Sequence, residues 1–179
     1  MRPAQEWREL ESGVNTYCAY CEVGQDNRVV QYLERLGYPA AALQQVRRYY
    51  HQDKESTRRV PLLPRYVFFD AAADAEIDWY RIYSIPYVQK VLEYGDGERA
   101  LRAEDLEFVA WMKSMHGLME ISQVLQVGSR IRVIGGPLKH YEGNIVEVKK
   151  HRGVVAVQIG ENAHFAKVWC PVEYIEQAE

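Results

Sequence analysis

The feature that most constrains the fold is an apolar, aromatic-rich run at residues 62–69, Leu-Leu-Pro-Arg-Tyr-Val-Phe-Phe. The run is short and rich in strand-forming residues, which predicts a β-strand. Pro64 cannot donate a hydrogen bond to a sheet, so we expect it at the start of the strand or on an edge. Because side chains alternate along a strand, Tyr66 and Phe68 are predicted to share one face. A strand that is apolar on both faces lies inside a covered sheet or presents a surface to a partner.

Length and composition narrow the class of protein. A chain of 179 residues, 47% hydrophobic and 12% aromatic, is that of a folded protein with one large domain or two small ones. Three cysteines form a small, odd set, which favours a reducing cytoplasm over a disulfide framework. Residues 1–13 lack the apolar core of a signal peptide, and no apolar run nears the roughly 20 residues of a membrane-spanning helix. We therefore expect a cytoplasmic protein.

The first two thirds of the chain alternates between strand and helix patterns. Apolar residues up to position 36 have helical spacing, and Gly37 is placed to cap that helix. The pattern predicts strand 16–23, a helix ending near 36, hairpin arms 46–52 and 59–69 with a tip at 53–56, a helical turn at 79–83, strand 88–94 and a helix at 103–115. Leu106, Val109 and Met112 are predicted to form the apolar stripe of the last helix. This order predicts an α+β sandwich in which helices cover an antiparallel sheet.

The last third has a different texture. Short runs of β-branched residues are punctuated by glycines, which predicts five short strands in a small β-barrel. Residues 117–126 show no strong periodicity and are expected to be a linker. The predicted division is an N-terminal extension at 1–13, an α+β domain at 14–116, the linker at 117–126 and the barrel domain at 127–179.

Two segments resemble signatures of one family. Residues 127–146, Val-Gly-Ser-Arg-Ile-Arg-Val-Ile-Gly-Gly-Pro-Leu-Lys-His-Tyr-Glu-Gly-Asn-Ile-Val, resemble a KOW motif, in which a strand enters a Gly-Pro turn. Residues 63–68, Leu-Pro-Arg-Tyr-Val-Phe, resemble the Phe-Pro-Gly-Tyr-Val signature of the NusG N-terminal domain. Residues 79–88, and Tyr17 with Gly24, resemble two further family blocks. The resemblance to the NusG family covers roughly residues 15–176, with all blocks in the family's order.

This resemblance implies a transcription elongation or antitermination factor, with an NGN-like α/β sandwich followed by a small SH3-like KOW barrel. NusG-like factors bind the clamp helices of RNA polymerase through an apolar face of the N-terminal domain. They touch the non-template DNA and suppress pausing or termination, while the KOW domain recruits nascent RNA or a ribosomal or termination protein. The resemblance implies a bacterial, nucleoid-associated protein. We also expect no enzyme activity, no cofactor, no metal site and no membrane partner.

Four positions depart from the family pattern. Thr16 stands where the family usually has Trp, and Arg65 where it often has Gly. His140 replaces a common Gly in the KOW turn, and Tyr83 lies where specialised relatives often carry Arg. These differences suggest a specialised paralogue similar to the LoaP or RfaH branches.

Leu63, Tyr66 and Phe68 are the candidate polymerase contacts that the resemblance implies. Aromatic residues are frequent at interface hot spots because they offer a large, rigid area. The pattern of the strand alone favours a different interpretation, in which Tyr66 is a core residue whose hydroxyl finds a partner. The family match favours the contact at Tyr66. Leu63 and Phe68 are weaker candidates on the same argument, and one of them is expected to lie in the core.

Two basic clusters are candidate nucleic-acid contacts. Residues 47–65 carry six Lys or Arg against two acids, and guanidinium groups bind phosphates while Tyr49 and Tyr50 could stack on unpaired bases. The second cluster is a predicted turn at 149–152, with Lys139 and His140 expected nearby. Solvated turns without a ligand are the alternative interpretation for both clusters. The candidate residues are Arg47, Arg48, Arg58, Arg59, Lys139, His140, Lys149, Lys150 and Arg152.

Other functional classes have less support. Cys18 and Cys21 form a CxxC pair, but a straight strand points them to opposite faces, and no second ligand pair completes a zinc site. A small redox enzyme that uses these thiols is one alternative. The chain contains no phosphate-binding glycine loop, HExxH motif or nucleophile elbow. The other alternative is a ribosome-associated or RNA-processing protein in which the KOW domain binds RNA.

Overall fold

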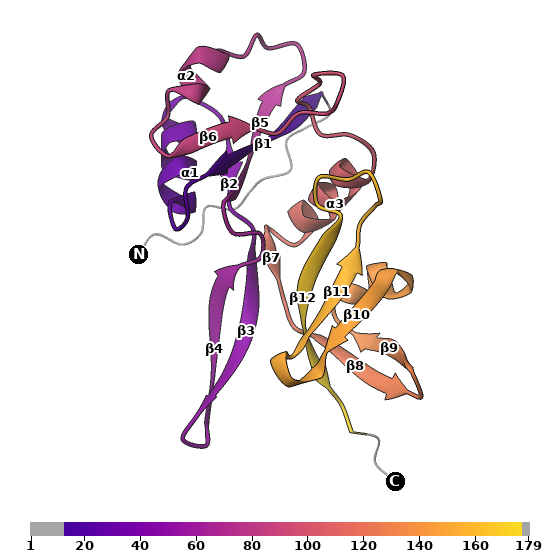
Figure 1. The fold of residues 1–179 in the computed structure, drawn as a ribbon. Coiled ribbons are helices and arrows are strands. Elements are labelled where there is room, and N and C mark those ends of the chain that lie inside the picture. The colour runs from indigo at the N-terminus through magenta and orange to yellow at the C-terminus, as the bar shows by residue number, and fades with distance from the viewer. Residues whose placement is uncertain (1–12, 177–179) are drawn as a thin grey trace. The chain divides into compact units, whose positions relative to one another are not determined.

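The computed structural model describes residues 13–176, which fold as two compact units (Figure 1). Unit 1, residues 13–43 and 63–117, contains β1 (Val14–Cys21), α1 (Asp26–Arg35), β2 (Ala40–Ala41), β5 (Tyr66–Ala72), α2 (Trp79–Tyr83), β6 (Val88–Val91) and α3 (Ala103–Ser114). Unit 2, residues 44–62 and 118–176, contains β3 (Gln44–His51), β4 (Lys54–Pro61), β7 (Leu118–Met119), β8 (Ser122–Val127), β9 (Arg130–Gly135), η1 (Pro137–Asn144), β10 (Ile145–Lys149), η2 (Lys150–Arg152), β11 (Val154–Gln158) and β12 (Lys167–Tyr174). The predicted extension at 1–13 lies outside the described residues except for Gly13. Between residues 13 and 176, every helix is too short or too polar to span a lipid bilayer.

Unit 1 is built on a four-stranded antiparallel sheet with the order β2-β5-β1-β6. The aromatic run supplies β5, one of the two central strands, and its side chains alternate as predicted. Val67 and Phe69 belong to a buried core that also contains residues of α1 and α2, namely Val29, Leu33 and Ile82. Tyr66 and Phe68 therefore point to the opposite face of the sheet.

Helix α1 forms where apolar residues recur at helical spacing, so that Val29 and Leu33 are buried one turn apart. It ends where Gly37 adopts a φ of 93°, a conformation that glycine tolerates at low cost. The Gly37 amide donates to the Glu34 carbonyl at 2.9 Å, and the Tyr38 amide donates to the Leu33 carbonyl at 3.0 Å. This pair of hydrogen bonds confirms the predicted glycine cap.

Helix α3 covers the other face of the unit 1 sheet. Lys113 Nζ lies 2.9 Å from Asp70 Oδ1 on β5 and 3.0 Å from Thr16 Oγ1 on β1. The Thr16 hydroxyl donates to the same carboxylate oxygen at 2.5 Å. The predicted apolar stripe was wrong at Leu106, which is 42% exposed. The helix instead turns a stripe that includes the larger Phe108 toward the sheet, and its buried residues are Asp105, Phe108, Val109 and Met112.

The second arm of the hairpin is shorter than predicted. β4 ends at Pro61 and β5 begins at Tyr66, with a turn at residues 62–65 in which the Tyr66 amide donates to the Leu63 carbonyl at 3.2 Å. Arg65 has a φ of 78°, which a continuous strand does not allow, and Pro64 has no amide hydrogen. The chain therefore leaves the hairpin, and β5 pairs with β1.

The hairpin itself is a long two-stranded ribbon (Figure 1). His51 pairs with Lys54, so the loop consists of Gln52 and Asp53 alone, not the four-residue tip predicted at 53–56. Both loop residues have positive φ, 47° and 61°, which is the geometry of a type I′ turn. The twist of that turn matches the twist of the flanking strands.

The remainder of unit 2 is a curled five-stranded sheet with the order β10-β11-β12-β8-β9. Residues 117–126, expected to be a linker, contain β7 and β8, and β8 pairs with both β9 and β12. The strand pattern was missed because Ser122 occupies a fully buried position, where its Oγ accepts the Leu138 amide at 2.9 Å. Gly136, with a φ of 92°, passes so close that a Cβ there would lie 2.7 Å from Ser122 Cα. The Gly-Pro turn of the predicted KOW motif therefore packs directly on β8.

Candidate functional site

A row of three side chains crosses unit 1 at one end of its sheet. In the strand register Tyr20 on β1 lies opposite both Tyr66 on β5 and Lys90 on β6. The two tyrosine rings are 5.1 Å apart, and Lys90 Nζ lies 5.4 Å from the centre of the Tyr20 ring. Both tyrosines are half-buried, and burial raises the pKa of Tyr66. We call Tyr20, Leu63, Arg65, Tyr66 and Lys90 the Tyr66 surface.

Arg65 joins this surface through four contacts. Its amide donates to Asp26 Oδ2 at 3.0 Å, and its Nε donates to the Cys21 carbonyl at 2.9 Å. Its Nη2 donates to Gln89 Oε1 at 3.0 Å, and the guanidinium lies 4.2 Å from the centre of the Tyr20 ring. Arg65 and Lys90 therefore both make cation–π contacts with the Tyr20 ring.

The three predicted polymerase contacts do not lie in equivalent places. Tyr66 and Leu63 are half-buried and reach the surface. Phe68 is fully buried, because it lies on the stretch of the sheet face that α3 covers. Phe68 is therefore a core residue and not a surface contact, and Leu63 is the member of this pair that reaches the surface.

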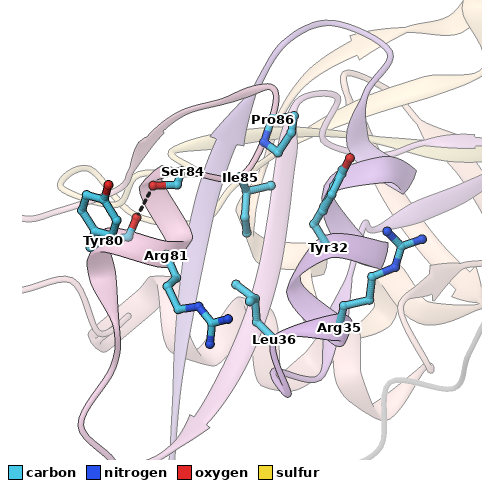
Figure 2. Close-up of a pocket in the computed structure, with 8 residues that line it drawn as sticks. All are labelled: Tyr32, Arg35, Leu36, Tyr80, Arg81, Ser84, Ile85 and Pro86. Carbon is cyan, nitrogen blue, oxygen red and sulfur yellow. Dashed lines mark hydrogen bonds between the residues drawn. The ribbon is translucent and has the colours of Figure 1, made fainter.

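A pocket of about 280 Å³ lies between α1 and α2 in unit 1 (Figure 2). Its wall is apolar at Leu36, Ile85 and Pro86, and two cations, Arg35 and Arg81, flank it (Figure 2). Tyr32, Tyr80 and Ser84 complete the lining. Such a pocket can hold an apolar or aromatic group that carries a negative charge beside it. Sequence reasoning missed this site, and the only local signal was an aromatic residue and a cation within one turn on each helix.

A groove of about 490 Å³ in unit 2 brings together two segments far apart in the sequence. Arg47, Arg48 and Tyr50 come from β3, and η2 supplies Lys150, His151 and Arg152. Arg47 Nη2 donates to the Arg152 carbonyl at 3.2 Å. Arg48 forms ion pairs with Glu55 at 2.8 Å and Glu173 at 2.6 Å. Members of both predicted basic clusters therefore line one groove, and we call it the hairpin groove.

The other predicted nucleic-acid residues lie elsewhere. Arg58 stacks over the Tyr49 ring at 5.2 Å, and Arg59 is exposed on β4. Lys139 Nζ donates to the Val133 carbonyl at 3.0 Å and to Glu142 Oε2 at 2.9 Å, and this contact lowers the pKa of Glu142. The two remaining candidates make aromatic contacts, His140 with Tyr141 at 4.7 Å and Lys149 over Trp169 at 4.1 Å.

The cysteines are placed as small core residues. Cys18 and Cys21 are fully buried free thiols, and burial raises the pKa of Cys18 well above its usual value and that of Cys21 from 9.0 to about 11. Thiols that ionise so late are poor nucleophiles near neutral pH, which argues against the redox alternative. Within residues 13–176 no group of three His, Cys, Asp or Glu side chains is placed to hold a metal ion.

Comparison with known proteins finds one matching family and a similar solved structure. The model of the NusG family, described as transcription termination factor nusG, matches residues 16–110, more than half of the chain. A solved structure titled "Domain interaction in Thermotoga maritima NusG" is similar with a TM-score of 0.50 and 17% sequence identity, and the match covers 88% of this chain and 92% of that one. A search of curated proteins gives no match.

The structural likeness defines the class of fold, an α+β unit of the NusG N-terminal type combined with a KOW-like β domain. This confirms the fold class predicted from the sequence. The family model matches more than half of the chain, so the protein belongs to the NusG family. Members of this family are transcription elongation and termination factors, and RNA polymerase is their partner.

Proposed function

We propose that this protein binds the clamp helices of RNA polymerase through the Tyr66 surface and suppresses pausing or termination. It acts by binding and not by a reaction. A ligand that contacts one conformation of the clamp better than another shifts the population toward that conformation, here the closed, elongating state. We assign this role to an N-terminal domain at residues 14–116.

One observation carries the proposal: two tyrosines pack against each other on a sheet face and remain half-exposed where α3 no longer covers it. Rigid aromatic side chains with a partly desolvated surface are typical of interface hot spots. Arg65 and Lys90 both place positive charge near the Tyr20 ring, at 4.2 Å and 5.4 Å from its centre. The surface therefore suits an apolar helix that carries acidic side chains beside its contact residues.

We further propose that the hairpin contacts the non-template DNA and that the KOW domain, residues 127–179, recruits nascent RNA or a ribosomal or termination protein. The exposed arginines of β4, Arg58 and Arg59, support the DNA contact because their guanidinium groups are available to phosphates. Exposed apolar side chains on the curled sheet support a protein partner, among them Val127, Ile134, Val146 and Val148.

The test is the affinity of the full chain for core RNA polymerase, measured by retention on immobilised protein. We expect Tyr66→Ala to weaken binding by about 2 kcal/mol, roughly thirtyfold, because it removes a central aromatic contact. Tyr66→Phe, which keeps the ring, should retain most of the affinity. Tyr49→Ala is the matched control, since Tyr49 is a 40% exposed tyrosine of unit 2. Equal retention of wild type and Tyr66→Ala would contradict the proposal.

A second candidate function is that of a ribosome-associated or RNA-processing protein, and the basic hairpin groove of unit 2 is the observation that favours it. The two candidates separate in the same assay. A chain that binds RNA but shows no retention of polymerase, with or without Tyr66, would support the second function over the first.

A further inference from the structure

The hairpin groove is built from two chain segments that are distant in the sequence, and pairing within unit 2 holds them together. Strand β3 pairs with β7 from Gln44 opposite Leu118. Arg48 on the same strand reaches Glu173 on β12 at 2.6 Å, and Arg47 reaches the carbonyl of Arg152 at 3.2 Å. The hairpin and the η2 turn are thus two walls of one groove of about 490 Å³.

The cations of the groove divide into two kinds. Arg48 has a structural role, because its guanidinium forms ion pairs with both Glu55 and Glu173. Among residues 13–176, Arg47, Lys150 and Arg152 form no ion pair with a carboxylate. His151 adds a fourth polar side chain to the wall formed by η2. The walls therefore carry at least three positive charges that no carboxylate of the described chain neutralises.

Two tyrosines complete the groove. Tyr50 is 69% exposed, so its ring is available to a ligand. The Tyr174 hydroxyl is buried with no hydrogen-bond partner within the described residues, and Lys150 Nζ lies 5.1 Å from the centre of the Tyr174 ring. A buried hydroxyl without a partner lowers stability unless a ligand or water supplies one.

We propose that the hairpin groove is a single binding site for a single-stranded polynucleotide. Arg47, Lys150 and Arg152 bind its phosphates, and Tyr50 stacks on an unpaired base. Separated phosphates need separated cations, and an unpaired base offers a flat face to an aromatic ring. The volume of this groove lies within the range of known ligand sites.

This inference rests on the proposal that the protein contacts nucleic acid, and it changes that proposal in two ways. It replaces separate surfaces on the hairpin and the KOW domain with one joint site. It also removes Arg48 from the predicted contacts, and of the two tyrosines expected to stack on bases it keeps Tyr50 and leaves out Tyr49. It does not depend on polymerase binding, so the two proposals can fail separately.

The experiment titrates the full chain with fluorescein-labelled hexauridylate and with the matching DNA hexamer at low salt. A ligand this short covers one site only. We therefore expect Arg47→Ala and Arg152→Ala, on opposite walls, each to weaken binding of the same oligomer about tenfold. Each should also lower the salt-dependence slope by about 0.7. Tyr50→Ala should weaken binding about tenfold, and Tyr50→Phe should not.

Matched controls separate the groove from diffuse charge. Arg130→Ala and Arg132→Ala each remove the same charge from an exposed position on β9, outside the groove. Both variants should bind within about twofold of wild type. Comparison of the RNA and DNA hexamers shows which kind of strand the groove prefers. Binding of either hexamer that depends on the groove residues supports the site.

Three results would overturn the proposal. The first is an absence of binding to both oligomers at low salt. The second is an equal loss for groove and control arginines, which would mean that net charge alone attracts the ligand. The third is equally tight binding of a polyglutamate peptide of the same charge, since a peptide chain offers no base for Tyr50. Retention of polymerase by the same preparation shows independently whether the polymerase proposal holds.

Discussion

At Arg65 the backbone adopts a φ of 78°, a region that costs a residue with a Cβ roughly 1–2 kcal/mol. Where the family signature often has Gly, that cost is absent. Here the side chain compensates for it through its contacts with the Cys21 carbonyl, Gln89 and the Tyr20 ring. The departure from the family pattern thus adds a cation to the Tyr66 surface at a position where glycine could add nothing.

The two contributions of Arg65 can be separated with a pair of variants. Arg65→Ala and Arg65→Gly both remove the side-chain contacts, but only glycine relieves the backbone. We expect Arg65→Gly to be more stable than Arg65→Ala by about 1 kcal/mol. Urea unfolding followed by tryptophan fluorescence measures the difference. Equal midpoints for the two variants would show that the positive φ costs little at this position.

Among the helices, α3 is fixed to its sheet by charge as well as by apolar packing. Asp70 is fully buried, and Lys113 and Thr16 both donate to its Oδ1. A buried carboxylate is tolerated when it is paired, and removing one partner leaves an uncompensated charge. Thr16 is part of this network, so the residue that replaces the family's usual Trp has a role in holding α3.

We expect Lys113→Met to destabilise unit 1 by about 3 kcal/mol, because it removes the Lys113 cation from beside the buried Asp70 carboxylate. The double variant Lys113→Met/Asp70→Leu removes both charges and should recover most of that loss. Chemical denaturation of the two variants beside wild type provides the measurement. If the single variant is as stable as the double, the ion pair is not what holds the helix.

Local patterns predicted much of unit 1, because alternation and helical spacing depend on neighbours in the chain. The two faces of β5 and the Gly37 cap are examples. What local patterns missed depends on distant pairing. The β3–β7 and β12 contacts bring Arg47 to Arg152, and helix packing creates the pocket at Leu36. The positive φ of Arg65 was hidden because an arginine gives no signal for a left-handed conformation.

At the scale of the whole molecule, the buried cysteines can report separately on the unfolding of each unit. Cys18 and Cys21 lie in unit 1 and Cys170 in unit 2, and burial raises the pKa of all three. We expect no alkylation near neutral pH until a unit unfolds, with one urea midpoint for Cys18 and Cys21 and a separate one for Cys170. Peptide mass spectrometry after pulsed alkylation measures both. Rapid labelling of Cys21 in native buffer would contradict its burial and revive the redox alternative.

The raised thiol pKa of Cys21 also predicts how the stability of the fold changes at alkaline pH. The folded-state pKa of Cys21 is raised from 9.0 to about 11, so folding favours the protonated thiol. Its contribution to stability is present below pH 9 and is lost as the pH rises toward 11.

Unit 2 is discontinuous in the chain, since Gln44–Leu62 are separated from its remaining residues by Leu63–Gly117. During synthesis β3 and β4 can pair at once, but β7 and β12, which contact β3, leave the ribosome only much later. At roughly 5–20 residues per second that delay lasts several seconds. For this time the nascent hairpin exposes an open strand edge, which is a template for pairing with other chains. We expect the arginines along the hairpin to act as gatekeepers during this time, because like charges keep two such nascent ribbons apart.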